Sequence, residues 1–101
     1  MMNTLKIKSY KVKTHIGNYR NNNNLAISLI TDIGEPFATL TVNINTLADD
    51  CLASVDTNNC PWAEDFIKDN KLGTPTGMYQ TSGWCSYPVY RFDLDEVKKY
   101  S

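Results

Sequence analysis

A short polar segment, Asp56-Thr57-Asn58-Asn59, runs directly into Cys60-Pro61-Trp62 and gathers side chains that could bind a ligand. Carboxylates and amides form hydrogen bonds, and the first turn of a helix offers free backbone N–H groups to an anion. The same residues also fit the start of a helix, with Asn59 or Cys60 as the cap and Pro61 in the first turn. Because acidic residues flank the segment and would repel an anion, we expect the cap.

A second candidate lies in Ser82-Gly83-Trp84-Cys85, a turn-like segment between two strand-like runs. Tyrosine and tryptophan combine a large apolar ring with a polar tip and are favoured at binding surfaces. We therefore expect Trp84 to be exposed. The residues that we predict to bind a partner or ligand are Asp56, Asn58, Asn59, Trp84 and Tyr87.

Catalytic and metal-binding patterns are weak in this sequence. His15 is the only histidine, and Cys85 is the one thiol that we would pair with it for nucleophilic catalysis. Two carboxylates, Asp56 and Asp93, could meet only if the last strand lies beside the fourth. Phosphate-loop, dinucleotide-binding and zinc-protease motifs do not occur. We expect no catalytic residues, no metal site and no cofactor, and therefore not an enzyme.

The composition indicates a globular chain that forms one domain, residues 1–101. Hydrophobic residues make up 42% of the 101 residues and charged residues 21%, with a net charge of −1. The absence of a basic stripe argues against strong direct binding of nucleic acid. No apolar run reaches the ~20 residues of a membrane span, so we expect a cytoplasmic protein without a membrane partner. Three cysteines without a CxxC motif indicate free thiols.

Period-two alternation and turn residues predict six strands, and helical spacing predicts a helix between the fourth and fifth. The fold class is therefore α+β, an antiparallel sheet of about five to six strands. One main helix, about 61–71 and ended by Gly73, packs on one face, and a short C-terminal helix follows Asp93 as its cap. The predicted strands are 4–16, 25–33, 37–44, 51–55, 78–81 and 87–92.

The pattern also predicts local features of these elements. A shift in the alternation predicts a bulge or break near Lys8-Ser9. The run of asparagines from Asn21 to Asn24 is expected in a loop, and Gly73 to Gly77 in a turn-rich connector. In the third strand, one face of the alternation is predicted to lie in the core: Ala38, Leu40, Val42 and Ile44.

Three segments together resemble the domain-of-unknown-function family 4313, which occurs in small proteins of gut and Gram-positive bacteria and their mobile elements. They are GEPFATLTVNI (34–44), VDTNNCPWAEDFIKDNKLG (55–73) and SGWCSYPVYRFDL (82–94). The resemblance covers the chain from about Leu25 to Leu94. It carries no residue roles, but it indicates that the polar segment 56–59 is a family signature.

The resemblance implies a setting, because small proteins of plasmids, transposons and phages often counter host defences. Our leading hypothesis is a non-enzymatic, anti-CRISPR-like inhibitor that binds a host defence protein such as a CRISPR nuclease. The alternative is a protein that binds a small ligand or sequesters a signal nucleotide, in a pocket or dimer seam formed by Asn58, Asn59, Ser82, Trp84 and Tyr87. A second alternative is an accessory protein that binds nucleic acid.

Overall fold

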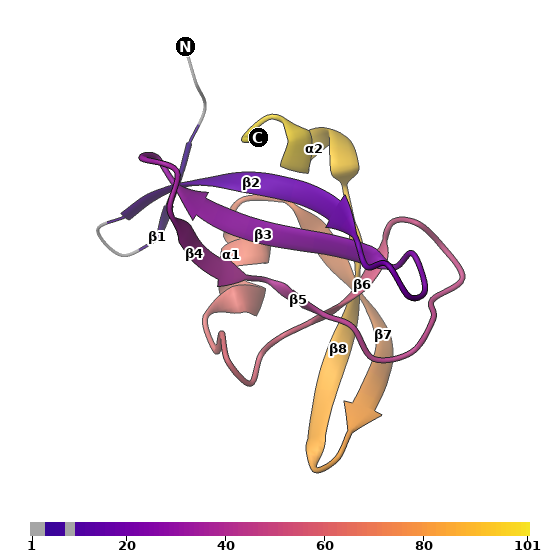
Figure 1. Ribbon diagram of the computed structural model, residues 1–101. Helices are drawn as coiled ribbons and strands as arrows, with labels where there is room; N and C mark the ends of the chain where they lie inside the picture. Colours follow the sequence, from indigo (N-terminus) through magenta and orange to yellow (C-terminus); the bar gives the residue numbers. More distant parts are fainter. Residues whose placement is uncertain (1–3, 8–9) are drawn as a thin grey trace.

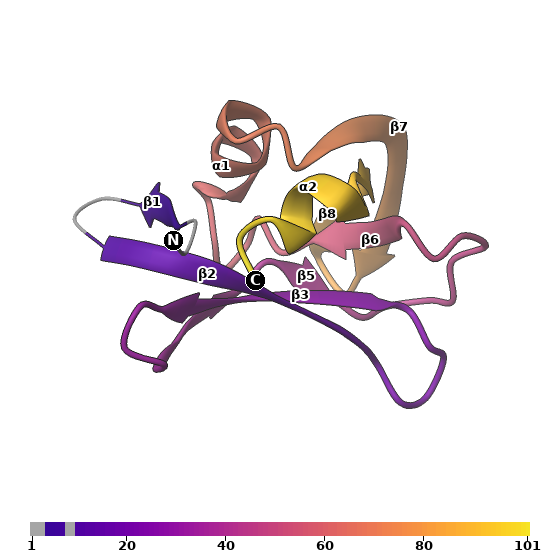
Figure 2. The same ribbon diagram turned by 90° about the horizontal axis from the view of Figure 1, so that it is seen from above.

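The computed structural model describes residues 4–7 and 10–101, in which two four-stranded antiparallel sheets lie against each other with two short helices (Figures 1 and 2). Sheet A has the order β1-β2-β3-β4, and sheet B has the order β5-β6-β8-β7. The strands are β1 (Leu5–Ile7), β2 (Tyr10–Asn18), β3 (Leu25–Thr31), β4 (Pro36–Thr39), β5 (Thr41–Val42), β6 (Leu52–Val55), β7 (Gly73–Ser82) and β8 (Cys85–Phe92). The helices are α1 (Ala63–Asp69) and α2 (Leu94–Lys98).

The chain passes from sheet A to sheet B at Leu40, between β4 and β5. The backbone N–H of Leu40 donates to the carbonyl of Ile27 in sheet A at 2.9 Å. Its carbonyl accepts from the N–H of Asp56, directly after β6 of sheet B, at 2.8 Å. The Leu40 side chain is fully buried. One residue therefore connects the two sheets through both backbone groups and through the core.

Both helices lie on the same side of sheet A as sheet B (Figure 2). Helix α1 buries Ala63, Phe66 and Ile67, which belong to one core cluster formed by both sheets. Helix α2 crosses β2, where the hydroxyl of the buried Thr14 donates to the carbonyl of Val97 at 2.6 Å. The α+β class is therefore confirmed, with two sheets in place of the single sheet that we predicted.

The single-sheet prediction was wrong because the third predicted strand is divided. Leu40 is buried as expected, but Ala38, Val42 and Ile44 are only half-buried and Thr41, on the opposite face, is buried. A strand that changes partner sheets interrupts its own alternation, since the two sheets bury different faces. The bulge predicted at Lys8-Ser9 lies outside the described residues.

The stretch from Gly73 to Gly77 forms the first half of β7, so the predicted connector was also wrong. At Gly73 an added Cβ would come within 2.7 Å of the carbonyl oxygen of Arg91. This close approach of β7 to β8 explains the glycine, which we had interpreted as a helix stop. The chain instead leaves the helix at Lys71, which adopts a left-handed φ of 57°. The N–H of the next residue, Leu72, donates to the carbonyl of Ile67 in the helix.

The asparagine run is indeed a loop, and its side chains connect that loop to the segment after β5. Asn24 is 8% exposed; its amide nitrogen donates to Asn43 at 3.1 Å and to the carbonyl of Asn45 at 2.8 Å. Its amide oxygen accepts from the N–H of Leu47 at 3.0 Å. The run is therefore explained by packing and hydrogen bonds, without a ligand.

The three thiols are free, as expected. Within residues 4–7 and 10–101, no helix is long and apolar enough to cross a membrane.

Replacing Asn24 by Ala should lower the free energy of unfolding by about 2–3 kcal/mol, because buried partners lose their hydrogen bonds. Urea denaturation followed by circular dichroism measures the change. Asn21→Ala is the matched control: this exposed side chain accepts one hydrogen bond, from Asn43. It should cost less than about 1 kcal/mol. Equal losses at the two positions would contradict the structural role of Asn24.

Candidate functional site

The polar segment 56–59 is a compact turn that closes on itself. The carboxylate of Asp56 accepts from the backbone N–H of Asn59 at 3.2 Å and from its side-chain amide at 2.9 Å. The carbonyl of Asp56 accepts from the N–H of Cys60 at 2.9 Å. Aspartate commonly folds a turn in this way, by bonding the backbone a few residues on. The turn leaves Asn58 and Asn59 exposed.

The helix cap predicted in this segment is wrong. Helix α1 starts at Ala63, and Trp62 occupies the cap position without a side-chain hydrogen bond. Cys60, Pro61 and Trp62 form a separate turn, closed by the N–H of Ala63 donating to Cys60. The carboxylate of Asp56 is hydrogen-bonded within the preceding turn, at Asn59. The polar segment 56–59 therefore does not cap the helix. In contrast, Asp93 caps α2 as predicted, accepting from the N–H of Glu96 at 3.2 Å.

The second candidate lies on a hairpin that projects from sheet B (Figure 1). Strand β6 pairs with β8 only from Leu52 opposite Arg91 to Ser54 opposite Val89. The next residue of β8 is Pro88, which has no N–H to offer and so favours an end to the pairing there. From Pro88 to the turn, β8 pairs only with β7. The outer half of the hairpin is therefore a two-stranded ribbon.

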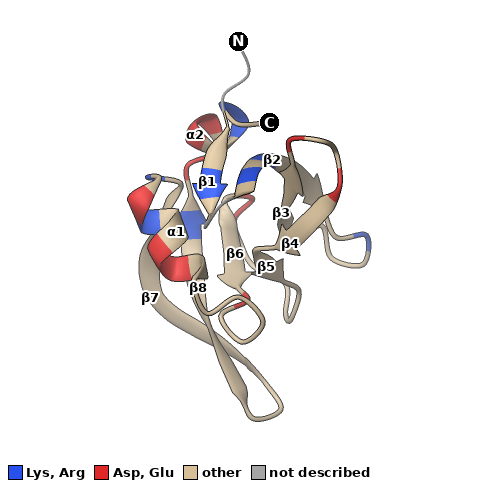
Figure 3. Ribbon diagram, turned by 90° about the vertical axis from the view of Figure 1, so that its left-hand side faces the viewer, with Lys and Arg blue, Asp and Glu red and all other residues tan. Residues whose placement is uncertain are grey.

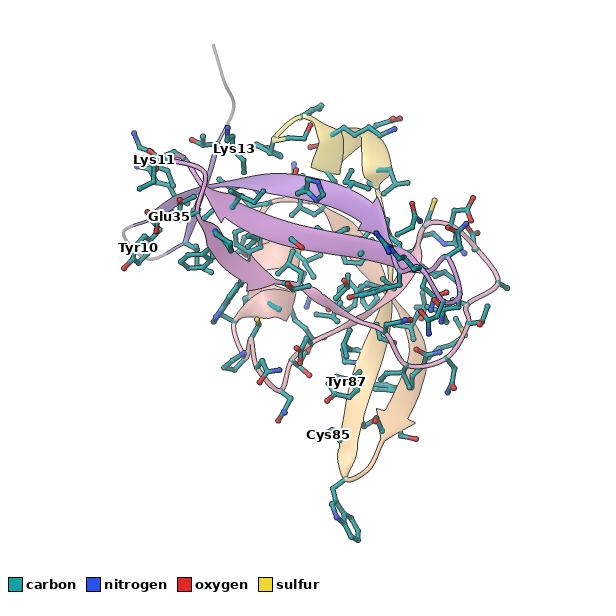
Figure 4. The ribbon with its side chains drawn as sticks, in the orientation of Figure 1. Tyr10, Lys11, Lys13, Glu35, Cys85 and Tyr87 are labelled. Atoms are coloured by element: carbon teal, nitrogen blue, oxygen red, sulfur yellow. The ribbon has the colours of Figure 1, made fainter. Side chains whose placement is uncertain are left out.

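Tyr87 connects this ribbon to the polar turn. It is 8% exposed, and its side chain lies on the same side of β8 as that of Cys85 (Figure 4). The Cys85 side chain beside it raises the pKa of Tyr87, and desolvation and the negative charge of Asp56 raise it further. The β6–β8 pairing ends with Ser54 opposite Val89, two residues before Asp56 and two residues after Tyr87. The two candidate segments, far apart in sequence, therefore extend from the same end of this pairing.

The ribbon also carries large apolar side chains in solvent. Trp84, at the turn, is 104% exposed, and Tyr79 and Met78 on β7 are 65% and 51% exposed. From Leu72 to Tyr90 the sequence has no charged residue, and Figure 3 shows the projecting hairpin without charge colouring. The hairpin is therefore uncharged and exposes three large apolar side chains.

Of the predicted binding residues, Trp84, Asn58 and Asn59 are exposed, Asp56 is half-buried and Tyr87 is buried. Their roles in binding stay predictions. The predicted binding residues did not include Tyr79 and Met78, although both lie in the predicted strand 78–81, because local alternation does not show which side chains of an edge strand stay in solvent. Two glycines and a proline obscured the length of the hairpin, although its lack of charge was visible in the sequence.

The weak catalytic and metal candidates are not brought together by the fold. His15 lies on β2 of sheet A, whereas Cys85 lies at the outer end of sheet B. Strand β8 does lie beside β6, but the antiparallel register puts Asp56 and Asp93 at opposite ends of the pairing. Among the residues that the structure describes, no group of His, Cys, Asp or Glu could hold a metal ion.

A hollow of about 600 Å³ lies away from the hairpin tip, where α1 meets the start of β7. Three of its side chains carry positive charge: Lys68, Lys71 and Arg91. Arg91 also bonds Asp49 at 2.9 Å, and this contact lowers the pKa of the Asp49 carboxyl. Asp93 also lines the hollow, while its carboxylate caps α2. The hollow therefore keeps a small excess of positive charge.

Comparison with known proteins identifies the family of this chain. Residues 4–101 match the family model DUF4313, a domain of unknown function, and the chain belongs to that family. The resemblance seen over residues 25–94 thus extends over nearly the whole chain. No curated protein and no solved structure matches it.

Replacing Asp56 by Asn should lower the pKa of Tyr87, because the negative charge that disfavours the phenolate is removed. Tyrosine labelled with ¹³C at Cζ and followed by NMR over a pH titration measures this change. Asp32→Asn, in the exposed β3–β4 turn, is the control and should leave Tyr87 unaffected. An unchanged Tyr87 titration in Asp56→Asn would contradict the effect of the Asp56 charge on Tyr87.

Proposed function

We propose that this member of the DUF4313 family is a non-enzymatic binding protein that docks on another protein through the β7–β8 hairpin. One observation carries the proposal: Trp84 is fully exposed at the turn of a projecting, uncharged ribbon. Tryptophan buries roughly 150–250 Å² when it enters a pocket and is enriched among residues that dominate binding energy. A ring held in water on a well-defined turn is suited to such a pocket.

The hairpin also reduces the entropic cost of binding. Cross-strand pairs hold Tyr79 opposite Pro88 and Gln80 opposite Tyr87. The Gln80 side chain accepts from Ser54 at 2.6 Å and donates to the carbonyl of Asn45 at 3.1 Å. These contacts attach the ribbon to the body, so the backbone that carries Tyr79 and Trp84 is positioned before a partner arrives. Preorganisation of this kind raises affinity because less freedom is lost on binding.

The partner that we propose is a host defence protein, in keeping with the mobile-element setting that the family resemblance implies. A CRISPR nuclease or a restriction enzyme is the case to test first. Because the hairpin has no charge, its contacts depend on shape and apolar area and should respond weakly to salt. Binding by nucleic-acid mimicry or directly to nucleic acid would instead depend steeply on salt.

Trp84→Ala should weaken binding to the defence nuclease by about 2 kcal/mol or more, roughly a 30-fold loss of affinity. A DNA-cleavage assay with Cas9 and with a restriction endonuclease, combined with a pulldown, measures inhibition and binding. Tyr79→Ala should also weaken binding. Tyr10→Ala is the control, since Tyr10 is 52% exposed but lies on β2, away from the hairpin.

Two results would contradict the proposal. The first is the absence of any nuclease partner together with unchanged cleavage. The second is a partner that binds Trp84→Ala as tightly as the unaltered chain while Tyr10→Ala binds weakly. Matching circular dichroism spectra for the three variants would show that each remains folded.

The hollow beside α1 favours a second candidate function, the binding of a small anionic ligand such as a signal nucleotide. Lys68 and Lys71 are exposed and form no ion pair with another described residue. Pro75 and the largely buried Phe92 also line this hollow. Phosphate oxygens could contact the lysines while a base covers the apolar part. This location differs from the pocket that the sequence predicted around Asn58, Trp84 and Tyr87.

If the hollow binds a nucleotide, ATP or a cyclic dinucleotide should raise the melting temperature, whereas adenosine should not. A ligand at 1,000 times its dissociation constant stabilises the folded state by about 4 kcal/mol. The double variant Lys68→Gln/Lys71→Gln should lose the shift, while Lys98→Gln, on α2, should keep it. The absence of a shift with every phosphate-bearing ligand would exclude this candidate.

A further inference from the structure

The outer edge of β7 has no partner strand within the described residues, because β7 is the last strand of sheet B. An unpaired edge offers its N–H and C=O groups to another strand, and proteins protect long edges with charge, proline or short length. The other sheet edges have such protection. β1 is 3 residues long with an exposed lysine, β4 is 4 residues and starts at Pro36, and β5 is 2 residues.

Strand β7 is different, since its 10 residues include no charged side chain. Pro75 and the irregular pairing between Pro75 and Tyr79 protect only its first half. The second half, Met78 to Ser82, has neither proline nor charge. This half also carries exposed apolar side chains at Met78 and Tyr79. The outer part of β7 is therefore an open edge suited to strand pairing.

The hairpin turn determines which backbone groups point outward. Gly83 has a φ of 60° while Trp84 does not have a positive φ, as in a type II′ turn. Ser82 and Cys85 close such a turn as a hydrogen-bonded pair, and the pairs alternate from there. Gln80 therefore directs its backbone groups toward β8. Tyr79 and Thr81 direct theirs outward, to the open edge.

We propose that β7 pairs with β7 of a second copy of this chain, antiparallel about a twofold axis at Gln80. Tyr79 of each copy then lies opposite Thr81 of the other. Both residues point their backbone groups outward, so each such pair exchanges its two hydrogen bonds. The result is one continuous sheet across the two copies. In this register the turn of each copy lies beside Gly77 of the other, where no heavy atom lies within 4 Å of an added Cβ.

The lack of charge favours a second copy as the partner of this edge. In a twofold pairing, residues near the axis face their own counterparts or close neighbours, so any charge there would face a like charge. The segment from Leu72 to Tyr90 has no charged residue, although 21% of the chain is charged. A different protein could offer opposite charges and would not require this. The inference stands apart from the proposed function, and the dimer would present two copies of Trp84.

Sedimentation velocity of the isolated full chain, from micromolar to millimolar concentration, tests the proposal without a nuclease. The unaltered chain should shift from monomer to dimer as concentration rises. Thr81→Pro removes an outward N–H from the open edge and should raise the dimer dissociation constant at least about tenfold. The matched control is Ser86→Pro: Ser86 lies opposite Thr81 and loses an outward N–H on the other side of the ribbon. It should dimerise like the unaltered chain.

A chain that stays monomeric throughout the concentration range would overturn the proposal. So would a dimer that is equally stable in Thr81→Pro, or one that Ser86→Pro abolishes to the same degree. If the chain is monomeric but a nuclease protects the N–H groups of Tyr79 and Thr81 from exchange, the edge belongs to that partner. Backbone NMR spectra of both variants would verify that the hairpin still forms.

Discussion

The structure depends on the passage of the chain between its two sheets at Leu40. The N–H of Leu40 donates to the carbonyl of Ile27 in sheet A, and its carbonyl accepts from the N–H of Asp56 after β6. The Leu40 side chain is fully buried. Next to it, the buried Thr41 accepts a hydrogen bond from the N–H of Ile27 through its hydroxyl at 3.1 Å. A backbone group left unpaired at this depth would cost free energy on the scale of a whole hydrogen bond. The passage therefore fixes the position of Asp56 and, through it, of the surface where the turn meets Tyr87.

Around this passage, polar side chains of the body are hydrogen-bonded within the chain, whereas the outer hairpin has an unpaired backbone edge. The side-chain amide of Asn24 donates to Asn43 and to the carbonyl of Asn45. The hydroxyl of Tyr90 donates to the carboxylate of Glu64 in α1 at 2.7 Å. Burial, together with that bond, raises the pKa of Tyr90 far above its usual range. The outer ribbon has the opposite character, with an unpaired edge and a fully exposed tryptophan. This contrast is the physical reason to assign recognition to the hairpin.

The sequence allowed much of this arrangement to be predicted, because local patterns report local structure. Alternation located most strands but not the division of the third or the full length of β7, Asp93 was recognised as a cap, and the Ser-Gly-Trp-Cys turn placed Trp84 in solvent. The remaining features depend on contacts between distant residues. The change of sheet at Leu40 cannot be detected from an unbroken strand-like run, and Gly73 looked like a helix stop because its neighbour Arg91 is distant in sequence. The burial of Tyr87 was not predicted, because nothing local shows that the segment after β6 lies near it.

Hydrogen exchange measured by NMR tests most directly whether the passage at Leu40 holds the sheets together. If it does, the N–H groups of Leu40 and Asp56 exchange only when the whole chain unfolds. Their free energies of exchange should then equal the free energy of unfolding from urea denaturation. Exchange of either group through an opening that costs about 2 kcal/mol less than global unfolding would show that the sheets separate locally, and would contradict the account.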